Sequence, residues 1–262
     1  MKSTKTLNQI EILVTRPAHQ AESLCQLIEQ QGGIPVRFPV IEITDIANTQ
    51  HLSTQLQHLS EFDIAIFISP NAVKYAFKHL DSNTIWPKHT KIAAVGKSSV
   101  KALDSVGLIA DIFPSQDFNS EALLELDAMH QVTGKRIIIF RGEGGRELLS
   151  STLTQRGAIV EYAECYRRQT PASDKTAVRD KLASNKISII TCTSNEGLQN
   201  LYDMIGETHR DSLLKTTLVV ISQRAATLAK QLGFKREPIV VSHMSDDAIL
   251  NSIIIWSKMQ QA

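Results

Sequence analysis

The chain has 262 residues, of which 42% are hydrophobic and 21% are charged, and its formal net charge at pH 7 is +1. This length suits one large hydrophobic core or two smaller domains, and we favour two. The small net charge, without a dense lysine or arginine tract, argues against a nucleic-acid partner. No apolar run reaches the length of a membrane span, and the first residues lack a signal-peptide core, so we expect a cytoplasmic protein with no membrane partner.

Cysteine and histidine spacing gives no sign of a disulfide framework or a metal site. Cys25, Cys165 and Cys192 are odd in number and far apart, without a C-x-x-C pair. The eight histidines are scattered and form no H-x-x-x-H pattern. A metal-dependent reaction therefore has no support in the sequence.

The chain begins with a predicted strand at residues 10–14, a helix, and a second strand at residues 34–38. Between the first strand and the helix, Pro17 suits the first helical turn because its missing N–H costs nothing there. Thr15 is the expected helix cap. The segment is one βαβ unit.

The same strand–loop–helix pattern recurs along the rest of the chain. Further strands are predicted at residues 39–43, 63–68, 91–95, 110–113, 137–140, 158–160, 187–192, 217–221 and 238–241. Helices are predicted at about residues 51–59, 122–129 and 247–256, after the loops at residues 69–71, 96–99 and 141–146, around Val178 and Leu182, and after the loops that begin at residues 193 and 222. About ten strands alternating with helices favour two five-stranded parallel sheets over a single eight-fold barrel.

Four predicted helices end in similar segments: QQGGIPV, SVGLIAD, QRGAIVE and QLGFKRE. Each has a glycine where a helix commonly stops, followed by a small or apolar residue. Two explanations stay open. The segments are the trace of an internal duplication, or they reflect the glycine stop that any doubly wound α/β chain reuses.

A glycine-rich loop, residues 141–146, follows the apolar strand at residues 137–140 and precedes a helix that begins near Glu147. Its glycines and the helix start could present N–H groups to an anion, and its two arginines favour a carboxylate or phosphate. The dinucleotide pattern G-x-G-x-x-G fails because Glu147 stands in the place of the third glycine. The remaining alternative is that the glycines serve only the turn.

Seven motifs, in order, resemble the uroporphyrinogen-III synthase family over nearly the whole chain. They are ILVTRPAHQAESL, FISPNAV, KIAAVGKSSVKAL, FPSQDFNSEALLEL, IIIFRGEGGRELL with GAIVEYAECYRR, TCTSNEGLQNL and VISQRAATLAKQLGF. The resemblance implies two doubly wound parallel-sheet α/β domains of the flavodoxin-like type, joined by a two-stranded antiparallel linker. Residues 1–38 and 168–262 would form a split first domain, and residues 41–165 an inserted second domain. The linker strands would be about residues 37–43 and 161–168.

The resemblance also implies an activity. Members of the family act without a cofactor on hydroxymethylbilane, a linear tetrapyrrole with eight carboxylates. They close the ring to uroporphyrinogen III, inverting ring D and releasing water. We therefore expect a monomeric, cytoplasmic enzyme with a small-molecule substrate and no cofactor or metal. The alternatives are a two-lobed protein that binds a small anion without catalysis, and a two-lobed NAD-linked oxidoreductase, which would need the glycine pattern that fails here.

Such a substrate needs many anion-binding groups facing one cleft, and helix starts after parallel strands supply them. The residues expected to bind it are Thr15, Arg16, Ser69, Asn71, Gly96, Lys97, Ser98, Arg141, Gly142, Gly144, Gly145, Arg146, Thr193, Ser194, Asn195, Ser222, Gln223 and Arg224. Pro70 departs from the family pattern and offers no N–H at its position.

Tyr166 is the candidate catalytic residue, because the family places a tyrosine on the returning connecting strand. We expect it at the mouth of the cleft, where its hydroxyl would help the substrate's hydroxyl to leave. The alternative is that Tyr166 only packs.

Overall fold

The structure is a computed structural model, and it describes residues 6–81, 85–243 and 245–261. The chain forms two compact units: unit 1 contains the chain up to Glu42 and from Gln169 onward, and unit 2 contains Ile43–Arg168. In the described part of the chain, no helix is long and apolar enough to cross a membrane.

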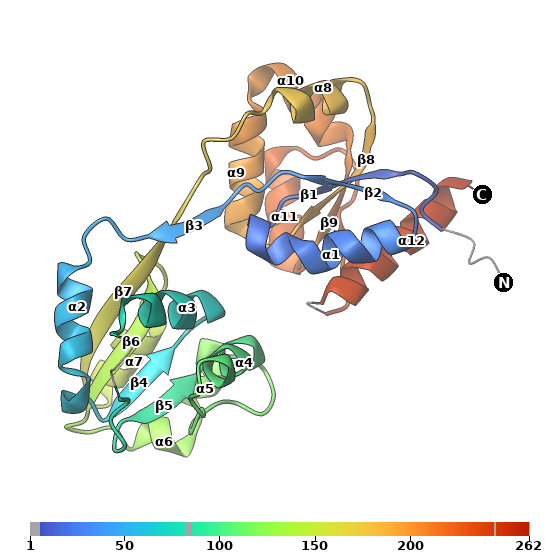
Figure 1. The fold of residues 1–262 in the computed structure, drawn as a ribbon. Helices are drawn as coiled ribbons and strands as arrows, with labels where there is room; N and C mark the ends of the chain where they lie inside the picture. The colour runs from blue at the N-terminus through green and yellow to red at the C-terminus, as the bar shows by residue number, and fades with distance from the viewer. Residues whose placement is uncertain (1–5, 82–84, 244, 262) are drawn as a thin grey trace. The chain divides into compact units, whose positions relative to one another are not determined.

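Unit 1 contains a five-stranded sheet whose strands lie in the order β10-β9-β8-β1-β2, and the neighbouring strands pair in parallel (Figure 1). The strands are β1 (Glu11–Val14), β2 (Ile34–Arg37), β8 (Ile187–Cys192), β9 (Thr217–Val220) and β10 (Ile239–Val240). β1, β8 and β9 are central and almost wholly buried, as their continuous apolar sequences predict.

Six helices of unit 1 are described: α1 (Ala18–Gln30), α8 (Thr176–Ala183), α9 (Asn195–Ile205), α10 (Glu207–Lys215), α11 (Gln223–Leu232) and α12 (Asp246–Gln261). α1 packs against α12, and both cover strand residues such as Ile12 in one hydrophobic cluster. α10 packs against α8 and α9, and α11 packs against α9. α10 was not predicted from the sequence, and α12 extends beyond its predicted end.

Unit 2 contains a second five-stranded sheet, with strands in the order β3-β7-β6-β4-β5 (Figure 1). The strands are β3 (Glu42–Asp45), β4 (Ile64–Phe67), β5 (Lys91–Ala94), β6 (Arg136–Gly142) and β7 (Ile159–Gln169). The pairs β4–β5, β4–β6 and β6–β7 are parallel. The described helices are α2 (Gln50–Gln57), the short 3-10 helix η1 (Leu59–Glu61), α3 (Pro70–His79), α4 (Lys97–Ser105), α5 (Ser120–Leu124), α6 (Asp127–His130) and α7 (Leu148–Gln155). The predicted α/β fold with parallel sheets is confirmed.

One predicted strand, at residues 110–113, was wrong. Only a single bridge forms there, between Ala93 of β5 and Ile112. The side chain of Asp111 accepts a hydrogen bond from the Ile92 N–H at 2.8 Å, so the pairing of backbone groups is interrupted by a carboxylate. Pro114 follows and could not donate to a longer ladder.

β7 is longer than predicted, and it contains the segment expected to serve as a linker. It runs from Ile159 to Gln169 without a break, and its parallel pairing with β6 continues to the pair Gly142–Tyr166. Arg141 faces Glu164 but Gly142 faces Tyr166, so Cys165 is an extra residue in β7, a β-bulge.

The four predicted glycine stops are confirmed. Gly32, Gly107, Gly157 and Gly233 have φ of +82°, +80°, +87° and +94°, the left-handed region in which glycine carries no Cβ penalty. In each case the next N–H bonds to the carbonyl five residues earlier, as from Ala158 to Leu153 at 3.1 Å. This pattern ends a helix and turns the chain back toward the sheet.

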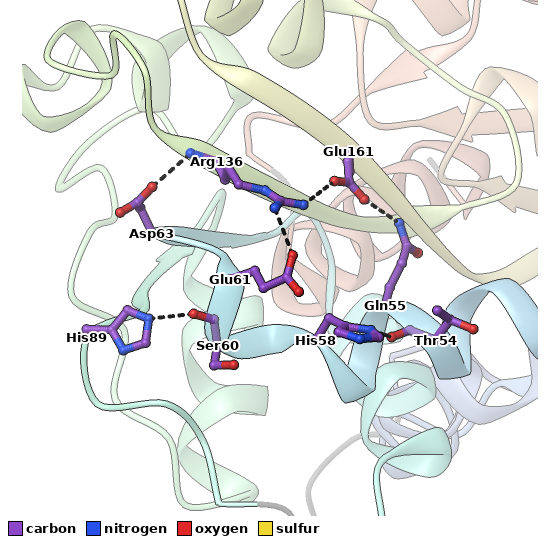
Figure 2. A network of polar contacts seen from close by, with 9 residues as sticks. All are labelled: Thr54, Gln55, His58, Ser60, Glu61, Asp63, His89, Arg136 and Glu161. Atoms are coloured by element: carbon purple, nitrogen blue, oxygen red, sulfur yellow. Dashed lines mark hydrogen bonds and ion pairs between the residues drawn. The ribbon is translucent and has the colours of Figure 1, made fainter.

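A polar network joins the amino-terminal ends of the unit 2 strands (Figure 2). The Arg136 guanidinium donates to Glu61 at 2.7 Å and to Glu161 at 3.0 Å, while its backbone N–H donates to Asp63 at 2.8 Å. Gln55 of α2 also donates to Glu161, at 3.3 Å. The network therefore links α2, η1, the residue before β4, β6 and β7 at the end of the sheet opposite the predicted substrate loops.

Candidate functional site

In unit 1, the predicted binding residues lie after three adjacent strands. Thr15 and Arg16 follow β1, residues 193–195 follow β8, and residues 222–224 follow β9. Because these strands are parallel neighbours in the order β9-β8-β1, their carboxyl ends share one edge of the sheet. The fold thus gathers loops that are up to about two hundred residues apart in sequence.

Thr15 is not the helix cap that the sequence predicted. Its side chain is buried, and its hydroxyl donates to the Thr191 carbonyl at 2.8 Å, which joins the ends of β1 and β8. Pro17 occupies the N-cap position of α1 instead, without a side-chain cap bond. Arg16 forms an ion pair with Asp246, the first residue of α12.

Two of the predicted binding serines in unit 1 cap their helices. Ser194 accepts from the Gly197 N–H at 2.9 Å, and Ser222 accepts from the Ala225 N–H at 3.2 Å. Each cap satisfies one N–H of the first turn, and a helix has four such groups without an intrahelical partner. The positive ends of α9 and α11 therefore lie at the sheet edge where the loops gather.

Unit 2 repeats this arrangement on its own sheet. Ser69 follows β4, residues 96–98 follow β5, the glycine-rich loop follows β6, and Tyr166 lies in β7. Ser69 caps α3 by accepting from the Ala72 N–H at 3.1 Å, whereas Gly96 at the start of α4 has no side chain to do so. The Nζ of Lys97 lies 4.6 Å from the centre of the Phe118 ring, a cation–π contact.

The glycine-rich loop folds around Arg141. This side chain is 3% exposed, and its guanidinium donates to the Gly142 carbonyl at 3.3 Å, to the Gly144 carbonyl and to Glu147 at 3.2 Å. Gly144 and Gly145 have φ of +67° and +109°, and a Cβ at Gly145 would lie 2.7 Å from Nη2 of Arg141. Gly144 and Gly145 therefore let the loop backbone fold around the Arg141 side chain. This supports the interpretation that these two glycines serve the turn.

Two partners of Arg141, Glu147 and Tyr162, were not predicted from the sequence. The Tyr162 hydroxyl donates to Glu147 at 2.5 Å, and the Tyr162 ring lies beneath the guanidinium of Arg141, 4.3 Å away. The hydrogen bond from Tyr162 and the charge of Arg141 lower the pKa of Glu147. Burial, followed by the hydrogen bond to Glu147, raises the pKa of Tyr162. The only sequence feature that pointed to these contacts was Glu147, which occupies the position of the third glycine in the dinucleotide pattern.

Tyr166 is buried within unit 2, with 1% of its surface exposed. Its hydroxyl lies 3.1 Å from Oγ of Ser69, and its ring centre is 5.8 Å from that of Tyr75. A Cβ at Gly142 would lie 2.7 Å from Cε2 of the Tyr166 ring, so the ring fills the space that glycine leaves open. The first glycine of the loop is therefore matched to the tyrosine across the β6–β7 pair.

A pocket of about 300 Å³ opens beside the glycine-rich loop in unit 2. Arg141, Arg146, Gly144 and Gly145 line it, as do Ser120 and Arg168, which were not predicted from the sequence. Arg146 is largely exposed and lies 3.5 Å from Glu121. Arg146 and Arg168 are exposed, and guanidinium groups suit a carboxylate.

The larger pocket of unit 1, about 640 Å³, contains none of the predicted residues. Lys215, Lys235, Arg236 and Trp256 are among its lining residues, which lie near the amino ends of β8 and β9. Helix carboxyl ends collect at this edge, and basic side chains complement their negative dipoles. We therefore place the candidate site at the opposite, carboxyl edge.

The described residues include no group of three or more histidine, cysteine, aspartate or glutamate side chains that could hold a metal ion. The three cysteines are buried and unpaired. Burial raises the pKa of the Cys165 thiol to about 12, which keeps it protonated and unreactive at neutral pH.

The lowered pKa of Glu147 predicts a pH dependence of stability. The charged carboxylate stabilises the folded chain above its unfolded pKa, roughly 4.3, and this contribution is lost as the pH falls through the lower folded value. Glu147→Gln should therefore lower the free energy of unfolding at pH 7, and the gap from wild type should close below about pH 4. Urea unfolding between pH 7 and pH 3 measures this. Glu125→Gln, at an exposed glutamate, is the control, and an equal gap at every pH would contradict the prediction.

The fold and the site define a class: an α/β protein of two units, each with loops and helix starts gathered at the carboxyl edge of a parallel sheet. Residues 22–249 match the family model described as uroporphyrinogen-III synthase HemD. The chain is 34% identical over 246 residues to uroporphyrinogen-III synthase from Escherichia coli K12, covering 93% of this chain and 100% of the relative. It is 33% identical over 246 residues to the enzyme from Salmonella typhimurium LT2, with the same coverage.

Solved structures agree in fold. A mutant uroporphyrinogen III synthase from Thermus thermophilus aligns with a TM-score of 0.63 at 15% identity, over 96% of this chain and 99% of that one. The synthetase from Helicobacter pylori 26695 aligns with a TM-score of 0.61 at 14% identity, over 94% of this chain and 99% of that one. The chain belongs to the uroporphyrinogen-III synthase family, as its seven motifs predicted. It is an enzyme of tetrapyrrole biosynthesis, a cyclising lyase.

Proposed function

We propose that this enzyme converts hydroxymethylbilane to uroporphyrinogen III, and that it holds the substrate's carboxylates at the carboxyl edges of its two sheets. The observation that carries this proposal is the gathering of the predicted loops after adjacent strands in both units. Several capped helix starts at one edge provide N–H groups and positive dipole ends for a ligand with many carboxylates. The residues proposed to bind are those expected from the sequence other than the buried Thr15 and Arg141, with Ser120 and Arg168 added from the pocket in unit 2.

We also propose the predicted domain organisation: two flavodoxin-like domains, the first split by the second, with an antiparallel linker. The strand order of unit 1 is that of a doubly wound flavodoxin-like sheet, which supports the first part. Gln169, the last residue of β7, donates to Glu42, the first residue of β3, at 3.3 Å, which supports an antiparallel pair. The cytoplasmic location, the monomeric state and the absence of a cofactor stay predictions.

The reaction needs few catalytic side chains, because the substrate's own pyrrole rings supply the electrons. The carbon–oxygen bond of the hydroxymethyl group breaks as its electron-rich pyrrole supplies electrons, and the hydroxyl leaves as water after gaining a proton. The last pyrrole then attacks the electron-poor carbon and is inverted through a spiro intermediate. The enzyme must hold the chain coiled, help the hydroxyl to leave and exclude the wrong closure. We assign the proton donation to Tyr166.

The test of this function is the identity of the product. The protein is incubated with enzymatically generated hydroxymethylbilane, and the type I and type III isomers are separated. Type III product in excess over a protein-free control supports the proposal. Tight binding of the substrate with no type III product would instead favour the alternative, a two-lobed anion-binding protein without catalysis.

Tyr166→Phe separates a chemical role from packing, because it keeps the ring and removes only the hydroxyl. We expect single-turnover formation of the type III product to slow about tenfold, near 1.4 kcal/mol in the barrier. The loss is smaller than for a typical general acid because the pyrrole itself assists departure of the hydroxyl. Melting temperatures are recorded alongside. Equal rates at equal stability would leave Tyr166 with a packing role only.

A further inference from the structure

We propose that Ser69 is a positioning residue for Tyr166: its hydroxyl donates a hydrogen bond to the phenol oxygen and leaves the phenol's own hydrogen for the substrate. The proposal rests on the proposed function and refines the role expected for Ser69 from direct substrate binding to support of Tyr166. The two oxygens lie 3.1 Å apart, on residues 97 positions distant in sequence.

The helix cap occupies part of the hydrogen-bonding capacity of the Ser69 hydroxyl. A serine hydroxyl has one hydrogen and two acceptor sites. One acceptor site of Ser69 is taken by the Ala72 N–H at 3.1 Å, which leaves the hydrogen free to point at Tyr166. In the opposite orientation, Tyr166 would donate to Ser69 and its proton would be engaged. The orientation in which Ser69 donates is the one compatible with Tyr166 acting as an acid.

Both residues are held in place by their surroundings. The backbone of Ser69 is extended, with φ of −159° and ψ of 161°, and Pro70 at the first helical position restricts it further. The Tyr166 ring is confined by Gly142 on β6 and by the Tyr75 ring on α3. The buried phenol oxygen is therefore held at a single position, next to the carboxyl end of β4.

The proton balance is complete without another reactant. Tyr166 gives its proton to the departing hydroxyl, which leaves as water, and the phenolate oxygen is stabilised by the Ser69 hydrogen bond. Ring closure later releases a proton from the carbon of the last pyrrole that forms the new bond. That proton returns to the phenolate, so the net change is the loss of one water.

A double-mutant cycle tests the proposal. Single-turnover formation of the type III product is measured for wild type, Ser69→Ala, Tyr166→Phe and the double variant. If Ser69 acts through the phenol, Ser69→Ala slows the wild-type enzyme about three- to tenfold but changes the Tyr166→Phe enzyme by less than about twofold. Equal slowing in both backgrounds would overturn the proposal, because Ser69 would then act on the substrate or through its helix cap.

Two further variants separate the cap from the phenol contact. Ser69→Thr keeps a capping hydroxyl and should retain most of the rate, whereas a rate as low as that of Ser69→Ala contradicts the proposal. Ser245→Ala removes an equivalent cap, in which Ser245 accepts from the Ala248 N–H at 3.1 Å at the start of α12. It should lower the melting temperature as Ser69→Ala does, without slowing the single turnover. Absence of type III product from wild type would reject the proposed function itself, so the two failures are distinct.

Discussion

Gly142→Ala is expected to slow type III formation about tenfold, as much as removal of the Tyr166 hydroxyl, because the displaced ring carries that hydroxyl away from the position where it acts. The added Cβ would lie 2.7 Å and 2.9 Å from ring atoms Cε2 and Cζ of Tyr166, closer than such atoms approach one another. The ring must move, and its hydroxyl must leave the position beside Ser69. Single-turnover rates measure the effect.

The control for Gly142→Ala removes the Tyr166 ring and keeps the methyl group that the alanine adds. In a Tyr166→Ala background there is nothing for the new Cβ to displace, so adding Gly142→Ala should change the rate and the melting temperature little. If Gly142→Ala slows the Tyr166→Ala enzyme as strongly as it slows wild type, the glycine acts on the loop or the substrate and not on the tyrosine.

Phe140→Ala is expected to destabilise unit 2 by about 3–5 kcal/mol, the usual cost of removing a fully buried phenylalanine. Phe140 and Phe67 are both 0% exposed, and their rings stack with centres 4.5 Å apart on the adjacent strands β6 and β4. The cavity would lie beside the ends of β6 and β4, from which the glycine-rich loop and the Ser69 cap follow. We therefore expect activity to be lost at a lower temperature than in wild type.

Tryptophan fluorescence can follow the unfolding of unit 2. The chain has two tryptophans, and Trp86 lies 6.0 Å from the Phe67 ring in unit 2, whereas Trp256 belongs to unit 1. In a Trp256→Phe background, urea unfolding therefore reports on Trp86. Phe113→Ala, at a side chain that is 44% exposed, is the matched control and should cost less than about 1 kcal/mol. A similar cost for both variants would place Phe140 outside the stabilising core.

Local patterns were sufficient for most of the fold. Continuous apolar runs such as residues 137–140 predicted buried parallel strands, because a strand covered by helices on both faces needs no polar side. Glycine stops were predictable because the left-handed conformation is set by backbone sterics at one residue. The strand at residues 110–113 was mispredicted because its pairing depends on the side chain of Asp111, which contacts β5 across 19 residues of sequence.

Arg141 and Tyr166 show what the local pattern could not reveal. The loop sequence suggested an arginine facing an anionic ligand, but the structure buries it against Glu147, Tyr162 and the loop's own carbonyls. Strict alternation along β7 would place Tyr162 and Tyr166 on the same face of the sheet. The bulge at Cys165 interrupts the alternation, so Tyr162 packs with one hydrophobic cluster and Tyr166 with the other.

The sequence by itself determined the family, the alternation of strands and helices, and the residue types that follow each strand, because these depend on short-range preferences and on motif order. Only the tertiary structure decided that Ser69, Gly142 and Tyr166 meet, since they belong to three different strand ends and their contact requires the order β7-β6-β4. The same strand order and the extra residue in β7 also decided the position of Tyr166. The sequence suggested a tyrosine at the mouth of a cleft, whereas in the structure its side chain is buried and its hydroxyl faces the Ser69 helix cap.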